Sequence, residues 1–418
     1  MSGSQHTETF ILGGYQSDFA RNATREGLAL TDLLREAACG ALESAQVDAS
    51  AVGVAHVGNF AAEIYSGQGH LGGLLVDAVP ALEGVGISRH EAACASGSMA
   101  LLAATADLAA GRAEVALVVG VELMRADGAF AAQSALGAAG RAHDEVVGLD
   151  YPWPQLFSDV ADEYDRRYGL DHVHLAAIAR KAFANGARNP RAQARTWAVG
   201  DASFGDDDEL NPVVAGRLRR YDCSQVTDGA AAVVLATADY AERWAAGHGR
   251  AMDELARIDG WGHRTARMTM ADKFTASRDQ PYVFPQLRGA AFDAFARAGI
   301  ASVEDLDAIE THDCFTISEY AALDHLGLTD PGESWKAIEE GRTELGGDLP
   351  VNPSGGLLAC GHPVGATGVR MLWDATRQVT GTAGDHQVEG ARRVATLNLG
   401  GSLTTVASFV VSNAMMAP

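Results

Sequence analysis

The sequence repeats itself weakly across its two halves, and this repeat constrains the fold more than any other feature. In residues 28–60, a helix-like apolar pattern leads into VDASAVGVAHVGNF, and in residues 287–315 a similar pattern leads into IASVEDLDAIETHDCF. In the alignment of the two segments, Ala38, Ala41, Leu42, Ala45 and Val47 fall opposite Ala291, Ala294, Phe295, Ala298 and Ile300. The repeat indicates that one structural unit occurs twice.

Strand-like and helix-like stretches alternate in both halves. The runs 113–122 and 394–412 are short, β-branched and apolar, which is typical of buried strands. Helical patterns occupy 97–111 and 365–379. This alternation predicts a duplicated α/β unit in which helices pack against sheets.

The segment between the halves, residues 126–221, carries a local reversal of charge. The chain has a formal net charge of -22, yet residues 166–195 contain seven cations against the single acid Asp171. One interpretation is a solvated helix face that the acids at 206–209 balance, and the other is a docking surface for phosphates. The candidate phosphate contacts are Arg180, Lys181, Arg188 and Arg191.

Composition excludes several classes of partner. Because the chain is strongly acidic, nucleic acid and anionic membranes are not expected as its main partners. The stretch MSGSQHTETFILGG has no basic region followed by an apolar core, so no secretory leader is expected, and no apolar run reaches the length of a membrane span. The five cysteines are scattered without a CxxC pair, which favours a reducing cytoplasm in which single thiols are free for chemistry.

Three stretches contain residue types that carry chemistry. In THDCF (311–315), His312, Asp313 and Cys314 follow a strand-like run, and such side chains serve metal binding, proton transfer or nucleophilic attack.

In GISRHEAACASGSMALL (86–102), Cys94 precedes a helix-like stretch. A helix N-terminus is expected to lower the pKa of a thiol and make it a nucleophile, although an inert buried cysteine is the alternative. Cys39 and Cys223 are predicted to be core residues.

The third stretch is ACGHPVGATG (359–368), in which glycines and a proline form a tight turn around His362. The turn is predicted to present the imidazole at the start of the following helix. Together with Cys94, it suggests a Cys–His pair for covalent catalysis.

These motifs resemble those of the thiolases over essentially the full length of the chain. EAACASGSMAL is similar to the nucleophile-cysteine region, SQVTDGAAAVVLA to the segment that returns from the loop domain, and NPSGGLLACGHPVGATG to the GHPxGxxG block. The resemblance implies an α/β fold of two duplicated βαβαβαββ halves in a layered α-β-α-β-α core. It implies an N-terminal half at 1–125 with a return strand at about 222–245, a CoA-binding loop domain at 126–221, and a C-terminal half at 246–418.

Two motifs depart from the usual thiolase pattern. NLGGS (398–402) places Asn398 where most thiolases have the second catalytic cysteine, and HDCF replaces NEAF. HDCF is typical of the sterol-carrier-protein-type thiolases. The resemblance implies that His312 donates to an oxyanion, that Cys314 is the acid/base, and that Asp313 is structural rather than a metal ligand. No attached sterol-carrier domain is expected.

The implied reaction is thiolytic cleavage of a 3-ketoacyl-CoA, or the reverse Claisen condensation, in lipid metabolism such as fatty acid β-oxidation. Cys94 attacks the 3-keto carbon, His362 takes its proton, and backbone N–H groups of Cys94 and Gly400 hold the acyl oxyanion. Coenzyme A is a co-substrate, with no permanently bound cofactor and no metal. A cytoplasmic homodimer or homotetramer is expected.

Three alternatives stay open at this point. They are a β-ketoacyl synthase-like condensing enzyme, a thiolase-fold aldolase, and a non-catalytic subunit. The set of Cys94, His312 and His362 is typical of the condensing enzymes, but this chain lacks their HGTGT motif. The retained Cys94 argues against the aldolase and against the non-catalytic subunit. The sequence leaves the acyl chain open. Trp153, Phe157, Phe183 and Trp197 could line a pocket, but packing within the loop domain is favoured.

Overall fold

The computed structural model describes residues 8–125 and 135–413. Parts of three predicted regions lie outside the described residues: 1–7 of the N-terminal half, 126–134 of the middle segment, and 414–418 of the C-terminal half. Within the described part of the chain, no helix is long and apolar enough to cross a membrane.

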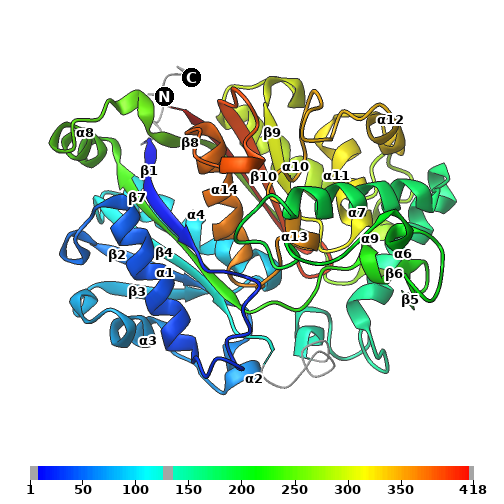
Figure 1. Cartoon of the computed structure of the whole chain (residues 1–418), viewed down its shortest axis with the longest axis horizontal. Helices are drawn as coiled ribbons and strands as arrows, with labels where there is room; N and C mark the ends of the chain where they lie inside the picture. Colours follow the sequence, from blue (N-terminus) through cyan, green and yellow to red (C-terminus); the bar gives the residue numbers. More distant parts are fainter. Residues whose placement is uncertain (1–7, 126–134, 414–418) are drawn as a thin grey trace.

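Strands from both halves of the chain build the centre of the molecule. The first half supplies β1 (Thr9–Gln16), β2 (Val54–Gly58), β3 (Gly86–His90), β4 (Val115–Glu122) and β7 (Gly229–Thr237). The second half supplies β8 (Ala256–Thr265), β9 (Ala308–Thr311), β10 (Arg393–Gly400) and β11 (Thr405–Asn413). They hydrogen-bond in the order β3-β2-β4-β7-β1-β8-β11-β10-β9 (Figure 1). β5 (Val213–Ala215) and β6 (Leu218–Arg219) form a separate two-stranded ribbon.

The helices of the two halves surround these strands. The first half contains α1 (Leu30–Ala45), α2 (Ala62–Ser66), α3 (Leu71–Ala78), α4 (Ser96–Ala109) and, after β7, α8 (Ala238–Gly247). The second half contains α9 (Met270–Ala276), α10 (Pro285–Arg297), α11 (Thr316–Leu326), α12 (Ser334–Glu339), α13 (Gly356–Ala359) and α14 (Thr367–Val379). The segment between them contributes α6 (Pro152–Tyr168) and α7 (His172–Gly186).

The predicted duplication is confirmed by the sheet. The order β2-β4-β7-β1 in one half is mirrored by β9-β10-β11-β8 in the other, and the halves join where β1 and β8 pair over three residues. Helix α1 precedes β2 as α10 precedes β9, and both helices bury a face of small residues, such as Ala41 and Ala294. The aligned repeat was therefore a repeat of structure.

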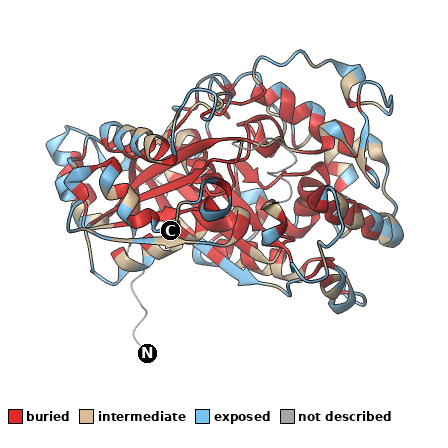
Figure 2. Ribbon diagram, turned by 90° about the horizontal axis from the view of Figure 1, so that it is seen from below, coloured by how far each residue is buried: buried red, intermediate tan, exposed pale blue. Residues whose placement is uncertain are grey.

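Separate apolar clusters define the layers of the core. Residues of α1 and α3 pack against the first half of the sheet, and residues of α10 and α11 pack against the second half. Between the two halves, α4 and α14 share a third cluster with strands of both. The predicted α-β-α-β-α layering is confirmed, and Figure 2 shows buried residues running through the strands while exposed positions lie on the outer helices.

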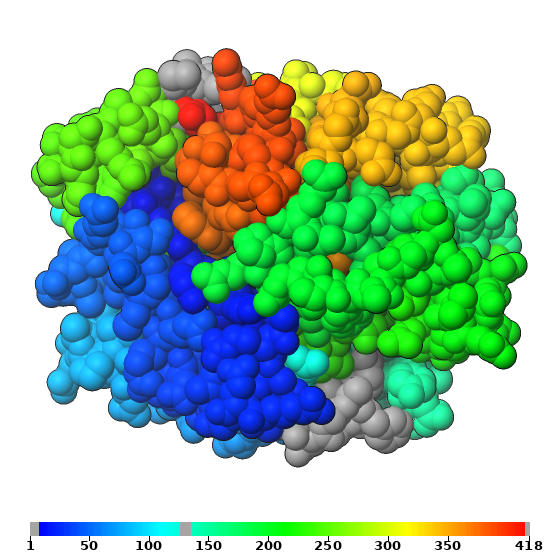
Figure 3. Space-filling model, viewed as in Figure 1, coloured from blue at the N-terminus to red at the C-terminus, as the bar shows by residue number. Residues whose placement is uncertain are grey.

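The described helices of the middle segment lie against the second half of the molecule. Residues of α6 and α7 belong to the same apolar cluster as α10 and α11. In Figure 3 this segment, coloured teal to green, forms the surface beside both halves. The middle segment therefore forms one wall of any site that lies between the two halves.

The N-terminal ends of α4 and α14 approach each other closely. A side-chain carbon at Gly97 would lie only 2.8 Å from the carbonyl oxygen of Gly365, and one at Gly365 would lie 2.6 Å from that of Val121. Only glycine leaves room for such contact between backbones. This contact brings together the segments that carry Cys94 and His362.

Candidate active site

Cys94 lies in a sharp turn between β3 and α4. The preceding residue, Ala93, has a φ of 51°, a left-handed conformation that is strained for alanine. The Ser96 hydroxyl stabilises the turn, since it accepts the Ala92 N–H at 2.9 Å and donates to the Ala93 carbonyl at 2.6 Å. The turn holds the half-buried thiol in place at the start of α4.

The expectation that the helix start lowers the pKa of this thiol is wrong. Burial raises the pKa of Cys94 to about 12, and the nearby Glu122 carboxylate adds to the shift. Hydrogen bonds from the Gly401 N–H and from the backbone N–H of Cys94 itself oppose the shift without outweighing it. The resting sulfur is therefore a neutral thiol that needs a base.

Two hydrogen bonds fix the loop that carries His362. The His362 backbone N–H donates to Thr227 Oγ1 at 3.0 Å, and the Gly365 N–H donates to a Glu122 carboxylate oxygen at 3.1 Å. Glu122 also accepts the N–H groups of Phe60 and Ala61, so it joins three segments at one point. Burial raises the pKa of Glu122 to about 7.

The hydrogen bonds of the His362 ring identify which nitrogen is free. The Thr367 hydroxyl donates to the Pro363 carbonyl at 3.0 Å, so it accepts the Nδ1–H of His362 at 2.7 Å. The lone pair then lies on Nε2. Burial, followed by the charge of Arg370, lowers the pKa of His362 to about 3. The ring is therefore a neutral base.

His312 completes a cluster with Cys94 and His362. The thiol sulfur and one ring nitrogen from each histidine all lie within 4.8 Å of one another. The Nδ1 of His312 lies 3.0 Å from the amide nitrogen of Asn398. Burial, then His362 and Arg370, lower the pKa of His312 well below its usual value. The structure thus brings together three of the four predicted catalytic side chains.

The same three atoms have a spacing that suits a metal ion such as zinc, which favours nitrogen and sulfur ligands. They are the only group of three or more such side chains found among the described residues. However, the Asn398 amide N–H that points at His312 Nδ1 leaves the ring proton on Nε2, where it blocks ligation. The arrangement fits proton transfer better than metal binding.

Cys314, the fourth predicted residue, lines the cavity in front of Cys94. Its sulfur lies 3.8 Å from Ser318 Oγ, and burial, then the neighbouring Cys94, raise its pKa well above the usual value. Cys360, the rival candidate for this role, lies elsewhere, with its sulfur 3.7 Å from Gln16 Nε2 and 3.6 Å from Asn189 Nδ2. It is not among the residues that line the cavity.

The cavity beside Cys94 has a volume of about 60 Å³ and is mostly apolar. Its apolar side chains include Phe60, Met124, Trp153, Pro154, Phe157, Phe315 and Val364. The expectation that Trp153 and Phe157 only pack the loop domain is therefore wrong. It holds for Phe183, whose ring lies 6.1 Å from that of Trp197. Trp153 and Phe157 in α6 differ from Phe183 because their rings pack into the apolar cluster of the second half of the molecule.

The contacts of two further predicted residues, Gly400 and Asp313, bear on their roles. The N–H that reaches the resting Cys94 sulfur is that of Gly401, whereas Gly400 is the last residue of β10 and pairs with Thr405, and its role at the acyl oxyanion stays a prediction. Gly401 begins the turn and has a φ of 60°. Asp313 accepts the Leu357 N–H at 2.5 Å and does not belong to the group of Cys94, His312 and His362, which fits its structural assignment.

The basic stretch does not form one phosphate surface. Lys181 was predicted wrongly, because its ammonium is buried in an ion pair with Glu319. Arg166 and Arg167 both pair with Glu163, and Arg195 pairs with Asp18. Arg180 and Arg188 are exposed.

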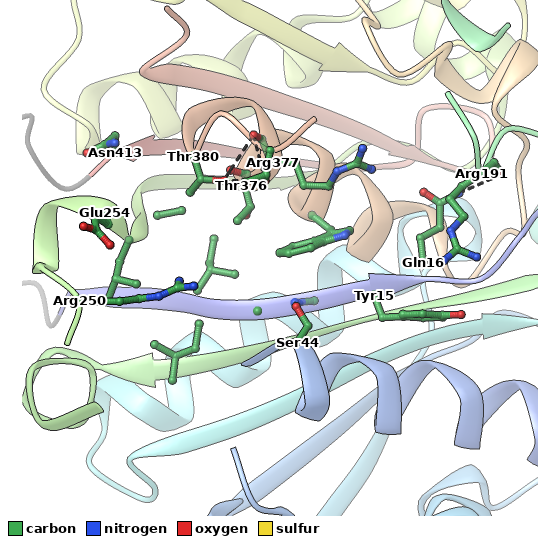
Figure 4. A pocket seen from close by; sticks show the side chains of 18 of the residues that line it. Tyr15, Gln16, Ser44, Arg191, Arg250, Glu254, Thr376, Arg377, Thr380 and Asn413 are labelled. Atoms are coloured by element: carbon green, nitrogen blue, oxygen red, sulfur yellow. Dashed lines mark hydrogen bonds between the residues drawn. The ribbon is translucent and has the colours of Figure 1, made fainter. Parts of the chain in front are cut away.

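Arg191 lies in a different and larger cleft. This cleft, of about 990 Å³, follows β1 and the C-terminal end of α14 (Figure 4). The Arg191 guanidinium lies 5.4 Å from the centre of the Tyr15 ring. Neither Cys94 nor His362 lines this cleft, so Arg191 is separated from the reactive cluster.

Sequence reasoning missed the residues that hold the cluster in place. Thr367 stands inside the glycine-rich block 359–368, Thr227 stands inside SQVTDGAAAVVLA, and Glu122 ends the strand-like run 113–122, but their types alone do not indicate these roles. Their roles become visible only from the contacts between distant segments, such as the one between Glu122 and Gly365.

Two family models match the two halves of the chain. A family model described as "Thiolase, N-terminal domain" matches residues 9–239, and one described as "Thiolase C-terminal domain-like" matches residues 269–413. An acetyl-CoA acetyltransferase of Methanothermobacter thermautotrophicus is 33% identical over 91% of this chain and 94% of its own length. Sterol carrier protein 2 of Gallus gallus is 30% identical over 94% of this chain and 69% of its own length.

Solved structures show the same fold. The Ltp2-ChsH2(DUF35) aldolase has a TM-score of 0.77 at 21% identity, covering 97% of this chain and 98% of that one. Human mitochondrial 3-ketoacyl-CoA thiolase in complex with CoA has a TM-score of 0.70 at 16% identity, with the same coverage. The HDCF stretch with His312 and Cys314 fits the sterol-carrier-protein-type subgroup. From its matched domains and relatives, the chain belongs to the thiolase family.

Proposed function

We propose that this thiolase, an acyltransferase, cleaves a short 3-ketoacyl-CoA with free CoA, or runs the reverse condensation, through an acyl group on Cys94. The observation that carries the proposal is the cluster of Cys94, His312 and His362, whose reactive atoms lie within 4.8 Å of one another. A nucleophile, a base and a hydrogen-bond donor at this spacing suit acyl transfer.

His362 is the base for the first step. Because burial keeps Cys94 as a neutral thiol, its proton must leave as the sulfur attacks the 3-keto carbon. The free Nε2 of His362 accepts this proton, since Nδ1–H is held by Thr367. The tetrahedral intermediate then collapses to acyl-Cys94 and an acetyl-CoA enolate.

Cys314 and His312 act on the enolate. His312 donates to the enolate oxygen, and Cys314 delivers the proton to carbon. The place of Cys314 in the cavity wall, together with Cys94 and His362, supports this assignment over Cys360. The backbone N–H groups of Cys94 and Gly401 stabilise the oxyanion on the acyl carbon, and each such donor is worth about 3 kcal/mol of barrier.

Coenzyme A is the co-substrate, and the middle segment, 126–221, is proposed as the loop domain that binds it. The relevant cations are Arg180 and Arg188, which are exposed, whereas Lys181 is buried. Arg180 pairs with the highly exposed Asp201 at 3.1 Å, a contact that a phosphate could replace. Ser224 and Gln225 line the cavity next to Cys94, so the thiol arm of CoA has a polar path along them.

The cavity favours a short acyl group. About 10–15 Å³ holds one water, so a volume of about 60 Å³ accommodates roughly four to six non-hydrogen atoms. Phe60, Trp153 and Phe157 surround this space with apolar surface. Acetyl to butyryl groups therefore fit better than long chains or steroids.

Assembly and setting form a further part of the proposal. β3 is an edge strand of the large sheet, and an open strand edge favours pairing with a second copy in a homodimer or homotetramer. The five cysteines are free thiols, which supports a reducing cytoplasm and a role in fatty acid β-oxidation or its reversal.

A carbon–carbon lyase of the aldolase type is the second candidate, since one solved neighbour is an aldolase. Its support is the fold alone, whereas Cys94 beside a neutral His362 has a use in acyl transfer. The test is CoA-dependent cleavage of straight-chain, branched and steroidal 3-ketoacyl-CoAs, with Cys94→Ala as control. Cleavage of the short substrates only when CoA and Cys94 are present supports the thiolase. Cleavage that needs neither would overturn it.

A further inference from the structure

Asn398 joins two segments that are distant in the sequence. It lies near the end of β10, and its side-chain amide reaches Ser98 of α4 on one side and His312 after β9 on the other. All three side chains are buried, with exposures of 1% or less. The amide therefore makes its hydrogen bonds to protein groups rather than to bulk water.

The direction of these bonds follows from the donors and acceptors. The Ser98 hydroxyl donates to Asn398 Oδ1 at 2.7 Å, which leaves the amide N–H groups to face His312. An amide nitrogen has hydrogens but no lone pair to offer, so at 3.0 Å it donates to the Nδ1 of His312. That nitrogen then carries no proton, and the proton of the neutral ring lies on Nε2.

The two histidines of the cluster thus have opposite tautomers. His362 keeps its proton on Nδ1, where Thr367 accepts it, and presents a bare Nε2. His312 presents an Nε2–H. The His362 ring can therefore accept a proton, and the His312 ring can donate a hydrogen bond, although both residues are histidines.

We propose that Asn398 is a positioning residue that fixes the tautomer of His312, so that its Nε2–H donates to the enolate oxygen during carbon–carbon cleavage. This rests on the proposed thiolase function. Asn398, which replaces the usual second cysteine, thus has a role of its own in this site. Cys314 supplies the proton, and Asn398 makes His312 the hydrogen-bond donor to the enolate oxygen. Ser98 holds the amide in the required orientation.

The first test reads the tautomer directly and needs no substrate. Histidine-labelled (¹⁵N) protein is studied by long-range ¹H–¹⁵N correlation, with His312→Gln identifying the His312 signals and His362→Gln those of its neighbour. We expect protonated Nε2 on His312 and protonated Nδ1 on His362. A proton on Nδ1 of His312 would overturn the proposal, and it would leave the covalent thiolase chemistry of Cys94 intact.

The second test exchanges the donor for an acceptor. In Asn398→Asp a carboxylate faces Nδ1 and raises the pKa of His312 above its value in the native protein. The ring then keeps Nε2–H only while it is doubly protonated, so activity relative to the native enzyme falls as pH rises. Asn398→Ala is the matched control, because it removes the donor without adding a charge.

The charged or titratable groups that face His312 in these variants are His362, Arg370 and Cys94, and all three are unchanged. We expect about a 10²–10³-fold loss of acetoacetyl-CoA thiolysis in Asn398→Ala, as for one lost oxyanion donor, with no added pH dependence in the ratio to native. A ratio for Asn398→Asp that is as flat as that for Asn398→Ala would contradict the proposal.

Discussion

The imidazole rings of His312 and His362 lie 5.2 Å apart, centre to centre, and perpendicular to each other. His312 follows β9 and His362 precedes α14, so the packing of the second half of the molecule creates their contact. Burial lowers the pKa of both rings, and each would further disfavour a positive charge on the other. The site therefore starts its reaction with two neutral histidines.

A neutral resting state gives a specific pH dependence for alkylation of Cys94. Because burial raises the pKa of the thiol to about 12, its thiolate fraction increases about tenfold per pH unit throughout the neutral range. We expect the rate of iodoacetamide labelling at Cys94, followed by peptide mass mapping, to rise continuously from pH 6 to 9. A plateau that begins below pH 7 would instead indicate a preformed thiolate–imidazolium pair.

Replacement of Cys314 separates the two halves of the reaction. Cys314→Ala removes the proposed proton donor but not the nucleophile, so acetyl-CoA still acylates Cys94. Carbon–carbon cleavage and formation fall by about 10²–10⁴-fold, as is typical of a lost general acid/base. The two half-reactions are followed by intact mass and by the enolate absorbance of acetoacetyl-CoA.

Cys360→Ala is the matched control for this experiment, since Cys360 is buried but does not line the cavity. We expect it to retain most of the activity of the native enzyme. If the two variants exchanged their behaviour, the proton donor would be Cys360 and the assignment of Cys314 would be wrong.

Arg180 tests the proposed CoA surface. Its guanidinium is exposed and pairs only with the exposed Asp201 among the ion pairs of the described residues. Arg180→Ala should raise the KM for CoA several-fold while kcat changes little, because a phosphate contact remote from the chemistry stabilises the bound ground state and the transition state equally. Initial rates at varied CoA decide this, and an unchanged KM would return the residue to the solvated surface.

Lys181, the next residue, should behave differently. Its ammonium is buried against Glu319, which also accepts from Asn352 Nδ2 at 2.8 Å. Lys181→Met leaves that carboxylate without its ion partner and should cost about 3–5 kcal/mol of unfolding free energy. Urea unfolding measures this loss, and native-like stability combined with a raised KM for CoA would contradict the burial of the pair.

The parts of the fold that sequence alone could predict are those with local signals. The small residues of α1 and α10 recur at helical spacing, and the apolar run of β4 before Glu122 is typical of a buried strand. His362 was found because glycine and proline restrict the backbone around it. Cys94 was found because small residues and a helix start surround it.

The remaining features depend on contacts between distant segments. Lys181 belongs to a cationic run, and only the packing of α7 against α11 turns it inward to Glu319. Gly400 ends β10, and the Gly401 N–H, rather than that of Gly400, reaches the resting Cys94 sulfur, a detail that a motif does not specify. The raised pKa of Cys94 likewise results from burial by several elements, which outweighs its local helix start.

The covalent intermediate is the central claim, and trapping it is its most direct test. The enzyme is mixed with acetoacetyl-CoA without free CoA, quenched in acid within seconds, and mapped by peptide mass spectrometry. We predict one acetyl group on the peptide that contains Cys94, its disappearance when CoA is added, and no adduct in Cys94→Ala. Release of acetyl-CoA at the native rate by Cys94→Ala, or an acetyl group on a different residue, would contradict the account.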